Sequence, residues 1–484
     1  MKTINMIWIV LLIVVCSSCE GFLDVEPSNA GDANTSIKTA ADAQVVINGL
    51  MRRMTHQYYY GRNFVMYGDA KGGDLTIFSQ GRGLDALYTF NHTQSANNYG
   101  TYWSHLYEGI LQMNNLLENI EKLEQEGTIE DFDNAKGRAL TARALIYFDL
   151  VRLYGKAYTD DKASYGVPNV TEPLEDTAQP LRASVEENYM QILADLTTAA
   201  PLLSKQKSNG YMNYYANKAL QARVHLYMGH HAEALSAAEE IINDGVYSLY
   251  ANNAWVDSWK TQFGTESIFE LGIFPNEGDL GSGSLGFYLR RRGDSPTAAG
   301  WFMASDYFLD RLGEDEDDVR WGVMAQDESE TPRLGSCYKY SGSVALEGDG
   351  KPENSTAVNI KVIRLSEIYL IAAEAALPTN PAAAAGYLNE IRKRSPNLLP
   401  ATAATITLDM ILDERGKELF AEGHRFFDMI RLNKSITFND DFAGISIPHR
   451  EKTIDRSFYK TILPISQGEI DANPGIESQQ NPGY

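Results

Sequence analysis

Residues 135–155 read AKGRALTARALIYFDLVRLYG, and this stretch decides the fold class. Its apolar side chains recur at spacings of three, four and one, which places them on one stripe of an α-helix. Gly155 ends the pattern, as glycine often does just after a helix. We expect the stripe to be buried against other helices. Its members are Leu140, Ala144, Tyr147, Phe148, Val151 and Tyr154.

Two further blocks repeat a helix, a short turn and a second helix. Residues 213–245 contain small residues in the first helix, a break near Gly229 and a second apolar stripe. Residues 364–394 repeat this arrangement with prolines in the turn. Small residues let paired helices approach closely, as in tetratricopeptide units. The sequence therefore predicts a mostly α fold, with a tetratricopeptide-like helical-repeat scaffold from Thr101 onward.

Two long stretches interrupt the helical pattern. Residues 58–103 and 275–302 are rich in glycine, aromatic rings and polar amides. Loops of this length inside a compact domain usually carry function. Rings beside polar groups suit flat, half-polar ligands, because an apolar face can stack while the polar edge stays wet. We expect these loops to form a ligand face.

Composition and motifs exclude several classes of function. The net charge of −22 argues against nucleic acid as a partner, because binding to phosphates requires a cationic surface. The eight histidines show no spacing with cysteine that would build a zinc site, and the pair His230 and His231 should be solvated at a helix break. We expect no metal and no cofactor.

The stretch GSGSLG at 281–286 matches the GxGxxG pattern of dinucleotide-binding turns. Such a turn must join a strand directly to the start of a helix. Here loop residues follow the expected strand at 267–274, and we expect no clear helix to start at Gly286. Because this context is missing, we expect no nucleotide site at this stretch.

The charged run at 414–432 contains Glu414, Glu418 and Glu422 at a spacing of four, interleaved with arginines. This spacing predicts a helix tied to its neighbours by ion pairs, with its aromatic residues on the buried side. Acid catalysis would instead need two carboxylates facing each other across a cleft. We therefore expect no catalytic residues and no enzymatic activity.

The N-terminus predicts export. The apolar run at 6–15 is too short to cross a bilayer and has the layout of a signal peptide. The residues before Cys19 resemble a bacterial lipobox, since the small Ser18 precedes the cysteine. We expect residues 1–18 to be the signal peptide and Cys19 to be lipidated, which leaves Cys337 without a disulfide partner.

At this point the chain resembles the SusD/RagB family, the surface lipoproteins of Bacteroidetes that bind nutrients, usually glycans. The order and spacing of several motifs along the whole chain carry the resemblance. They are CEGFLDVEPS (19–28), YWSHLYEGILQMNNLLENI (102–120), GRALTARALIYFDLVRLYG (137–155), ANKALQARVHLYMGHHAEAL (216–235), RLSEIYLIAAEA (364–375), LNEIRKR (388–394), DERGKELFAEGHRFFDMIRL (413–432) and LPISQGEIDANPGIESQQNPGY (463–484).

The resemblance implies one SusD-like domain over residues 19–484, with an N-terminal part at about 19–250 and a C-terminal part at about 265–484. It also implies a glycan-binding protein without catalytic activity. Such proteins deliver oligosaccharide to a partner SusC-like TonB-dependent transporter. The lipid anchor would hold the protein on the outer membrane, exposed at the cell surface.

In this family the ligand is held by aromatic rings and a few polar groups from the two loops. By residue type and place, we expect the rings to be Trp301, Tyr288, Phe287 and Tyr88, and the polar partners to be Asp74, Arg82, Asn91 and Arg290. The run from Arg290 to Arg292 could pair with uronates or sulfates, or balance the acidic surface locally.

Two other classes of function stay open. The helices could form a scaffold that grips a peptide or protein, as repeat solenoids often do. A secreted glycosidase would require a facing carboxylate pair in a cleft, and the sequence shows no sign of one.

Overall fold

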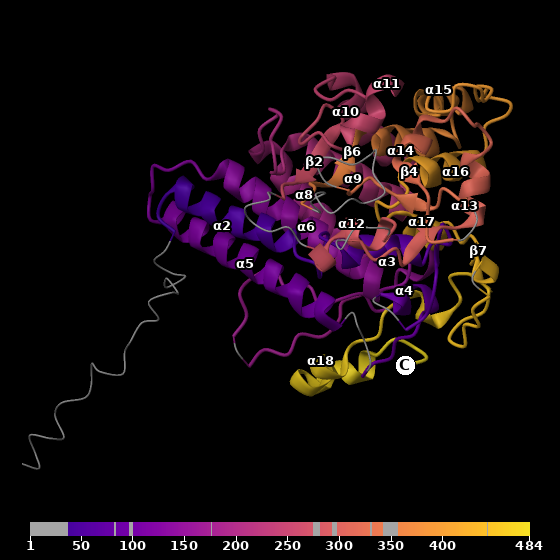
Figure 1. The fold of residues 1–484 in the computed structure, drawn as a ribbon. Helices are drawn as coiled ribbons and strands as arrows, with labels where there is room; N and C mark the ends of the chain where they lie inside the picture. The colour runs from indigo at the N-terminus through magenta and orange to yellow at the C-terminus, as the bar shows by residue number, and fades with distance from the viewer. Residues whose placement is uncertain are drawn as a thin grey trace, which may run out of the picture.

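The computed structural model describes residues 37–81, 84–95, 100–175, 177–273, 281–292, 298–329, 332–341, 357–442 and 444–484. Most of these residues are helical (Figure 1). The longer helices are α2 (Ala40–Met54), α3 (Asn63–Ala70), α5 (Gly100–Gln125), α6 (Asp133–Tyr154), α8 (Val185–Ala199), α9 (Tyr214–Met228), α10 (His231–Asp244), α14 (Leu365–Ala376), α15 (Pro381–Arg392) and α16 (Leu408–Glu418). The shorter helices are α4 (Asp85–Thr89), α7 (Tyr158–Asp161), α11 (Asn252–Ser258), α12 (Leu285–Leu289), α13 (Asp306–Leu312), α17 (Arg425–Arg431) and α18 (Gln467–Ala472). Short 3₁₀ helices lie at η1 (Ala200–Leu202), η2 (Gly281–Gly283), η3 (Val319–Val323), η4 (Asp440–Phe442), η5 (Tyr459–Thr461) and η6 (Pro474–Gln479).

Helix pairs stack in chain order to form the scaffold. Helix α2 contacts α5 and α6, α6 contacts α8, and α8 contacts α9. The stack continues through α10 to α14 and α15, across the molecule from α2 (Figure 1). Gly229, at a φ of 75°, ends α9; His230 lies at the break and His231 begins α10. Both histidines are half-buried, which corrects their expected exposure to solvent. The predicted tetratricopeptide-like scaffold and its break at Gly229 are confirmed.

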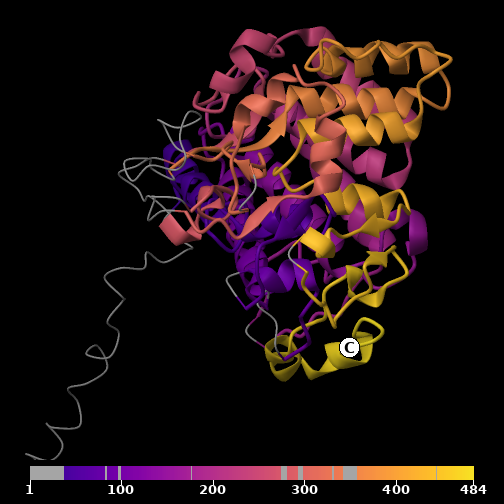
Figure 2. The ribbon, with the colours of Figure 1, turned by 45° about the vertical axis from the view of Figure 1, so that its right-hand side comes forward.

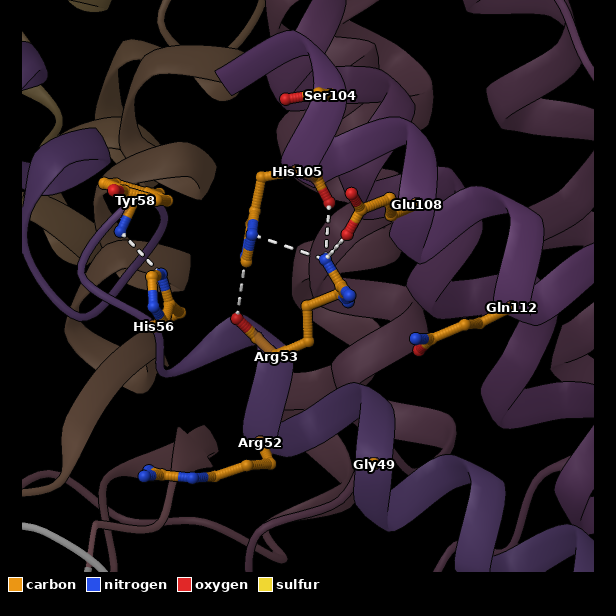
Figure 3. A pocket seen from close by; sticks show the side chains of 9 residues that line it. All are labelled: Gly49, Arg52, Arg53, His56, Tyr58, Ser104, His105, Glu108 and Gln112. Atoms are coloured by element: carbon orange, nitrogen blue, oxygen red, sulfur yellow. Dashed lines mark hydrogen bonds and ion pairs between the residues drawn. The ribbon is translucent and has the colours of Figure 1, made fainter. Parts of the chain in front are cut away.

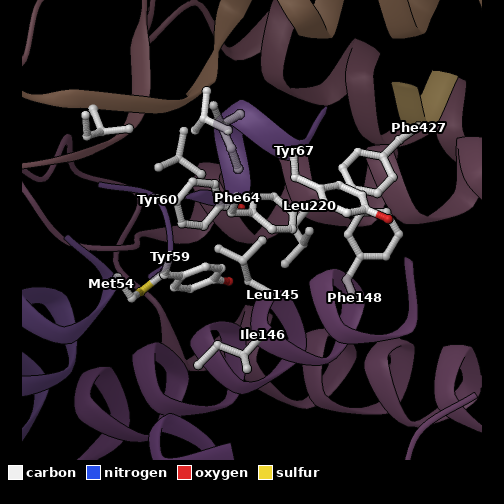
Figure 4. Packing of buried hydrophobic residues seen from close by; sticks show 14 of the residues in the cluster. Met54, Tyr59, Tyr60, Phe64, Tyr67, Leu145, Ile146, Phe148, Leu220 and Phe427 are labelled. Atoms are coloured by element: carbon white, nitrogen blue, oxygen red, sulfur yellow. The ribbon is translucent and has the colours of Figure 1, made fainter. Parts of the chain in front are cut away.

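Helix α6 lies inside this scaffold. The six residues of the predicted stripe are buried, but most other side chains of α6 are buried as well, because α2 and α5 cover one side and α8 another. Figure 4 shows Leu145 and Phe148 of α6 beside rings from residues 59–67 and beside Phe427. The hydroxyls of Tyr59 and Tyr60 both donate to Asp149 on α6. The chain thus fills the inner side of α6 with its own residues.

The described strands form short antiparallel pairs. These are β1 (Leu75–Ile77) with β3 (Phe302–Ala304), β2 (Ser267–Leu271) with β6 (Ile360–Arg364), β4 (Met324–Ala325) with β5 (Ser336–Cys337), and β7 (Ile436–Thr437) with β8 (Thr453–Ile454). Strand β2 confirms the expected strand over its first five residues, Ser267–Leu271, and residue 274 lies outside the described residues. After the β7–β8 pair, the C-terminal residues, yellow in Figure 2, extend to the end of the molecule opposite α15.

The run at 414–432 forms two helices, which corrects the expectation of one. Helix α16 ends at Glu418 because Ala421 and Gly423 take positive φ values of 63° and 85°, and α17 begins at Arg425. The left-handed backbone at these two positions cannot continue an α-helix. The carboxylates of Glu414 and Glu418 are buried within α16, before this break.

The three glutamates of this run, Glu414, Glu418 and Glu422, are here called the acidic ladder. They are buried and are paired with cations, most of them from other segments. Glu418 accepts from Arg364 at 3.0 Å, and Glu422 accepts from Arg364 and Lys339, each at 2.8 Å. Glu414 pairs with Arg320 at 2.7 Å. All of these side chains are at most 3% exposed. The predicted ion pairing is confirmed: some pairs form within the run, such as Lys417 with Glu414 at 3.4 Å, and the arginines that pair with Glu418 and Glu422 lie far away in the sequence.

Acidic pH is expected to destabilise this fold. Burial opposes the ionisation of Glu367 and Glu418, but nearby guanidinium groups prevail and lower the pKa of each carboxyl from 4.5 to about 2. Such groups stabilise the fold above their unfolded pKa, and this stabilisation is lost as the pH falls toward 2, at about 1.4 kcal/mol per pKa unit. Burial raises the pKa of Glu266 to about 7, so the stability that this group contributes below its unfolded pKa of about 4.5 is lost as the pH rises from there through about 7.

We expect the urea unfolding midpoint to be highest at about pH 4.5–5, to decline as the pH rises toward about 7 because the unfolded chain ionises Glu266 before the folded protein does, and to fall steeply below about pH 4. The measurement is urea unfolding followed by circular dichroism across this pH range. A midpoint that does not change between about pH 5 and about pH 3 would contradict the assignment of these buried carboxylates.

Of the three cysteines, the structure describes Cys337. Cys337 on β5 is buried and has no disulfide partner among the described residues, and burial raises the pKa of its thiol to about 11. The expected signal peptide and Cys19 lie outside the described residues. Within the described ranges, no helix combines the length and the apolar character needed to span a bilayer.

Candidate functional site

Strands β1 and β3 bring the two expected ligand loops together. Leu75 pairs with Ala304 and Ile77 with Phe302 in an antiparallel register. The backbone N–H of Phe78 then donates to the carbonyl of Trp301 at 3.3 Å. The loop at 58–103 and the loop at 275–302 therefore meet at one surface.

Three aromatic side chains, here called the ring cluster, lie at this junction: Phe287, Tyr288 and Trp301. The ring centroids of Tyr288 and Trp301 are 5.4 Å apart, and Phe287 lies 5.3 Å from Tyr288, all in edge-to-face geometry. Ser284 caps α12 by accepting from the N–H of Phe287. Phe287 and Trp301 are half-buried, and Phe78 beside them is 47% exposed. The cluster thus offers apolar ring surface on a fixed backbone.

Arg62 joins the ring cluster to the start of the first loop. Its guanidinium lies 5.2 Å from the centroid of the Tyr288 ring, within the range of a cation–π contact. The same group donates to the carbonyl of Ser282 and to the side chain of Asn63, each at 2.8 Å. Burial lowers the pKa of Arg62, while nearby tyrosines act in the opposite direction. The arginine therefore fixes the 281–289 segment against residues 57–63.

A pocket of about 520 Å³ lies next to Arg62, between the end of α2 and the first half of α5 (Figure 3). We call it the α2–α5 pocket. Its lining residues are Gly49, Arg52, Arg53, His56, Tyr58, Ser104, His105, Glu108 and Gln112. Gln57 lies in the sequence between the lining residues His56 and Tyr58. Its side-chain oxygen, Oε1, would lie 3.2 Å from a Cβ placed on Gly283. The pocket and the ring cluster are therefore neighbours on one surface.

Two stacked imidazoles form one wall of the α2–α5 pocket. The rings of His56 and His105 are 5.1 Å apart with planes 28° from parallel, and the edge of Tyr58 meets both. Arg53 forms an ion pair with Glu108 and lies 3.4 Å from Nδ1 of His105. Burial and neighbouring arginines lower the pKa of His56, and burial is the main cause of the lowered pKa of His105.

Several of the expected ligand residues lie elsewhere. Trp301, Tyr288 and Phe287 come together in the ring cluster, but Tyr288 is only 6% exposed, which corrects its expected role as a ring open to ligand; it packs against the other two rings. Asn91 is exposed, but its neighbours Phe90 and His92 contact the C-terminal rings of Phe458 and Tyr484, away from this surface. Arg82 lies outside the described residues.

Tyr88, Asp74 and Arg290 are buried, which corrects their expected exposure to ligand. The Tyr88 hydroxyl donates to Asp440 at 2.8 Å. Asp74 pairs with Arg311 at 2.6 Å. Arg290 is fully buried and donates to the carbonyl of Ser341 at 2.9 Å. We therefore no longer propose these three side chains as ligand contacts, and the run from Arg290 to Arg292 is not a uniformly exposed cationic patch.

The GSGSLG stretch also departs in one respect from expectation. A short helix, α12, does start at Leu285, directly after η2. The strand before it, β2, ends at Leu271 and pairs antiparallel with β6. A dinucleotide turn requires a parallel strand that leads directly into its helix. Because β2 is antiparallel and does not lead directly into α12, this stretch lacks the topology of a dinucleotide-binding turn.

Sequence reasoning missed the α2–α5 pocket. His56, Tyr58 and Arg62 stand within seven residues of one another, and His105 lies within a motif that we quoted only for its family pattern. The mixture of imidazole, guanidinium and phenol in one short loop is the signal that could have found them. No cluster of three or more metal-ligating side chains occurs in the parts of the chain that the structure describes.

The chain belongs to the SusD family. The model of the SusD family matches residues 314–484, and a model described as starch-binding and associating with the outer membrane matches residues 21–226. A SusD superfamily protein of Bacteroides thetaiotaomicron is 34% identical, with a TM-score of 0.82 over 92% of this chain and 100% of that one.

Two further relatives are similar to this chain. The SusD-like protein P25 of Formosa agariphila is 25% identical over the full length of both chains. A laminarin-binding SusD-like protein shares the fold, with a TM-score of 0.73 and 24% identity over 93% of this chain and 100% of that one.

Proposed function

We propose that this protein binds glycan on the ring cluster and passes it to a SusC-like TonB-dependent transporter in the outer membrane. The observation that carries the proposal is the packing of Phe287, Tyr288 and Trp301 in the second loop, where β1–β3 pairing joins it to the first loop and where Phe287 and Trp301 are partly exposed. A sugar ring stacks its apolar face on such rings. The starch-binding description of the matching family model and the laminarin-binding relative support a carbohydrate ligand.

Lipidation at Cys19 would hold the protein on the outer membrane. The family model described as associating with the outer membrane begins at residue 21, close to this cysteine. One lipid-bearing end gives only a weak hold, so a transporter would supply a second point of attachment.

We propose binding without catalysis. The acidic ladder contains the carboxylates considered above for acid catalysis. It is buried, and its carboxylates pair with Arg320, Arg364 and Lys339. Carboxylates that are sealed from solvent cannot act on a polysaccharide in a cleft. A peptide-binding scaffold has less support, because residues 59–67 and Phe427 already cover the inner side of α6.

The proposal is tested by affinity gel electrophoresis against a panel of neutral and acidic polysaccharides, with the reaction products analysed in parallel. We expect slowed migration with at least one polysaccharide and no release of oligosaccharide. Release of sugar from a bound polysaccharide would contradict the non-catalytic function. Binding to peptides without any response to glycans would favour the scaffold.

A further inference from the structure

The α2–α5 pocket is cationic although the chain as a whole is strongly acidic. The chain carries a net charge of −22. Among the lining residues, two guanidinium groups, Arg52 and Arg53, outnumber the one carboxylate, Glu108, which pairs with Arg53, and Arg52 also donates to the hydroxyl of Thr55 at 3.2 Å. Arg62 lies just outside this lining and close enough to disfavour protonation of His56. An anion would therefore be attracted to this part of the surface.

The hydrogen bonds of the two histidines assign their tautomers. Nε2 of His105 lies 3.0 Å from the carbonyl of Arg53 and therefore donates, which leaves its Nδ1 to accept from the Arg53 guanidinium. Nδ1 of His56 accepts from the backbone N–H of Tyr58 at 3.3 Å. The proton of neutral His56 is therefore on Nε2, and this N–H has no partner among the described residues. His56 is exposed, so the pocket presents a free donor beside Arg52 (Figure 3).

Gly49 keeps space open on the α2 side of the pocket. It lies within α2, where glycine costs about 1 kcal/mol relative to alanine. A Cβ placed on it would meet nothing within 4 Å. A large side chain at this position would extend into free space at the pocket lining rather than clash with the fold.

We propose that the α2–α5 pocket binds the anionic group of an acidic sugar, a carboxylate or a sulfate, through Arg52 and the Nε2–H of His56. The inference rests on the proposed function, because the ring cluster next to the pocket would carry the rest of the sugar chain. Charge-assisted hydrogen bonds from guanidinium and imidazole are the contacts that suit either oxyanion. The pocket thus names acidic glycans as the substrate class.

The test follows the imidazole signals of the protein by NMR while sodium glucuronate, sodium sulfate or glucose is added at constant ionic strength. His56→Gln and His105→Gln spectra assign the two signals. We expect saturable shifts of the His56 signal with glucuronate, with sulfate or with both, which also distinguishes the two anions. We expect none with glucose. Absence of a saturable shift with both anions, or an equal shift with glucose, would overturn the proposal.

Two pairs of variants locate the effect. Arg52→Gln should weaken the binding of the responding anion by about tenfold or more, as expected for the loss of one charged hydrogen bond, and Gly49→Leu should weaken it because the added side chain occupies the pocket. Gly386→Leu is the matched control, since Gly386 is also exposed, helical and free of contacts within 4 Å. Lys393→Gln controls for the loss of a positive charge, because Lys393 is exposed and directly follows α15, the helix that contains Gly386. Equal weakening by the control variants would overturn the assignment of the pocket.

Trp301→Ala separates this inference from the proposed function. The variant should lose polysaccharide binding and still show the shifts of His56 with glucuronate or sulfate, because Trp301 does not line the pocket. Retained polysaccharide binding by Trp301→Ala would contradict the ring cluster and leave the anion result to stand alone. Anion shifts that disappear in this variant would contradict an independent pocket.

Discussion

Replacing Arg364 with methionine is expected to lower the free energy of unfolding by about 3–5 kcal/mol. Arg364 is buried on β6 and contacts Glu422 at 2.8 Å and Glu418 at 3.0 Å. Removing one member of a buried ion network leaves carboxylates without water and without a sufficient counter-charge, and this cost exceeds the gain from the apolar side chain. The variant should therefore unfold at a clearly lower urea concentration.

Lys393→Met is the matched control for this substitution. Lys393 pairs with Glu390, but the two side chains are 64% and 41% exposed. Exposed pairs contribute about 0–1 kcal/mol, so this change should leave the urea midpoint nearly unchanged. Urea unfolding at pH 7, with both midpoint and slope compared, provides the measurement. Similar losses in the two variants would contradict the difference between buried and exposed ion pairs described above.

Replacing Trp301 with alanine is expected to reduce polysaccharide affinity by about tenfold to a hundredfold, or about 1.5–3 kcal/mol. Trp301 is half-buried and packs edge-to-face on Tyr288 and Phe287, so it presents ring surface at the junction of the two loops. Losing that surface removes the stacking contact. The scaffold should remain folded, because Trp301 lies outside the helix stack.

Tyr165→Ala is the control for Trp301→Ala. Tyr165 is 47% exposed and lies beside Arg182, far in sequence from both ligand loops. Isothermal titration with the polysaccharide that binds best should show unchanged affinity for this variant, with matching circular dichroism spectra for both proteins. An affinity of Trp301→Ala equal to that of the unsubstituted protein would remove this ring from the site.

The sequence predicted the helical scaffold because its signals are local. The apolar stripe of α6 and the glycine break after α9 depend on residues within a few turns of one another. The burial of the acidic ladder could not be predicted in this way. Charges at a spacing of four describe an exposed helix equally well, and the deciding partners, such as Arg320 and Arg364, are distant in sequence.

The candidate site was predicted at the level of loops and only partly at the level of residues. Residue type identified Trp301, Tyr288 and Phe287, which the β1–β3 pairing then brings beside the first loop. Residue type failed for Asp74 and Tyr88, because aspartate and tyrosine in a loop can equally turn inward to a buried partner. That choice depends on contacts across the fold, such as those with Arg311 and Asp440.

The most direct test of the central claim is a crystal structure of the protein with an oligosaccharide prepared from a polysaccharide that it binds. We predict that a sugar ring stacks on Trp301 or Phe287 in the ring cluster, between the two joined loops. A well-defined sugar bound elsewhere on the molecule, with the ring cluster unoccupied, would contradict the account.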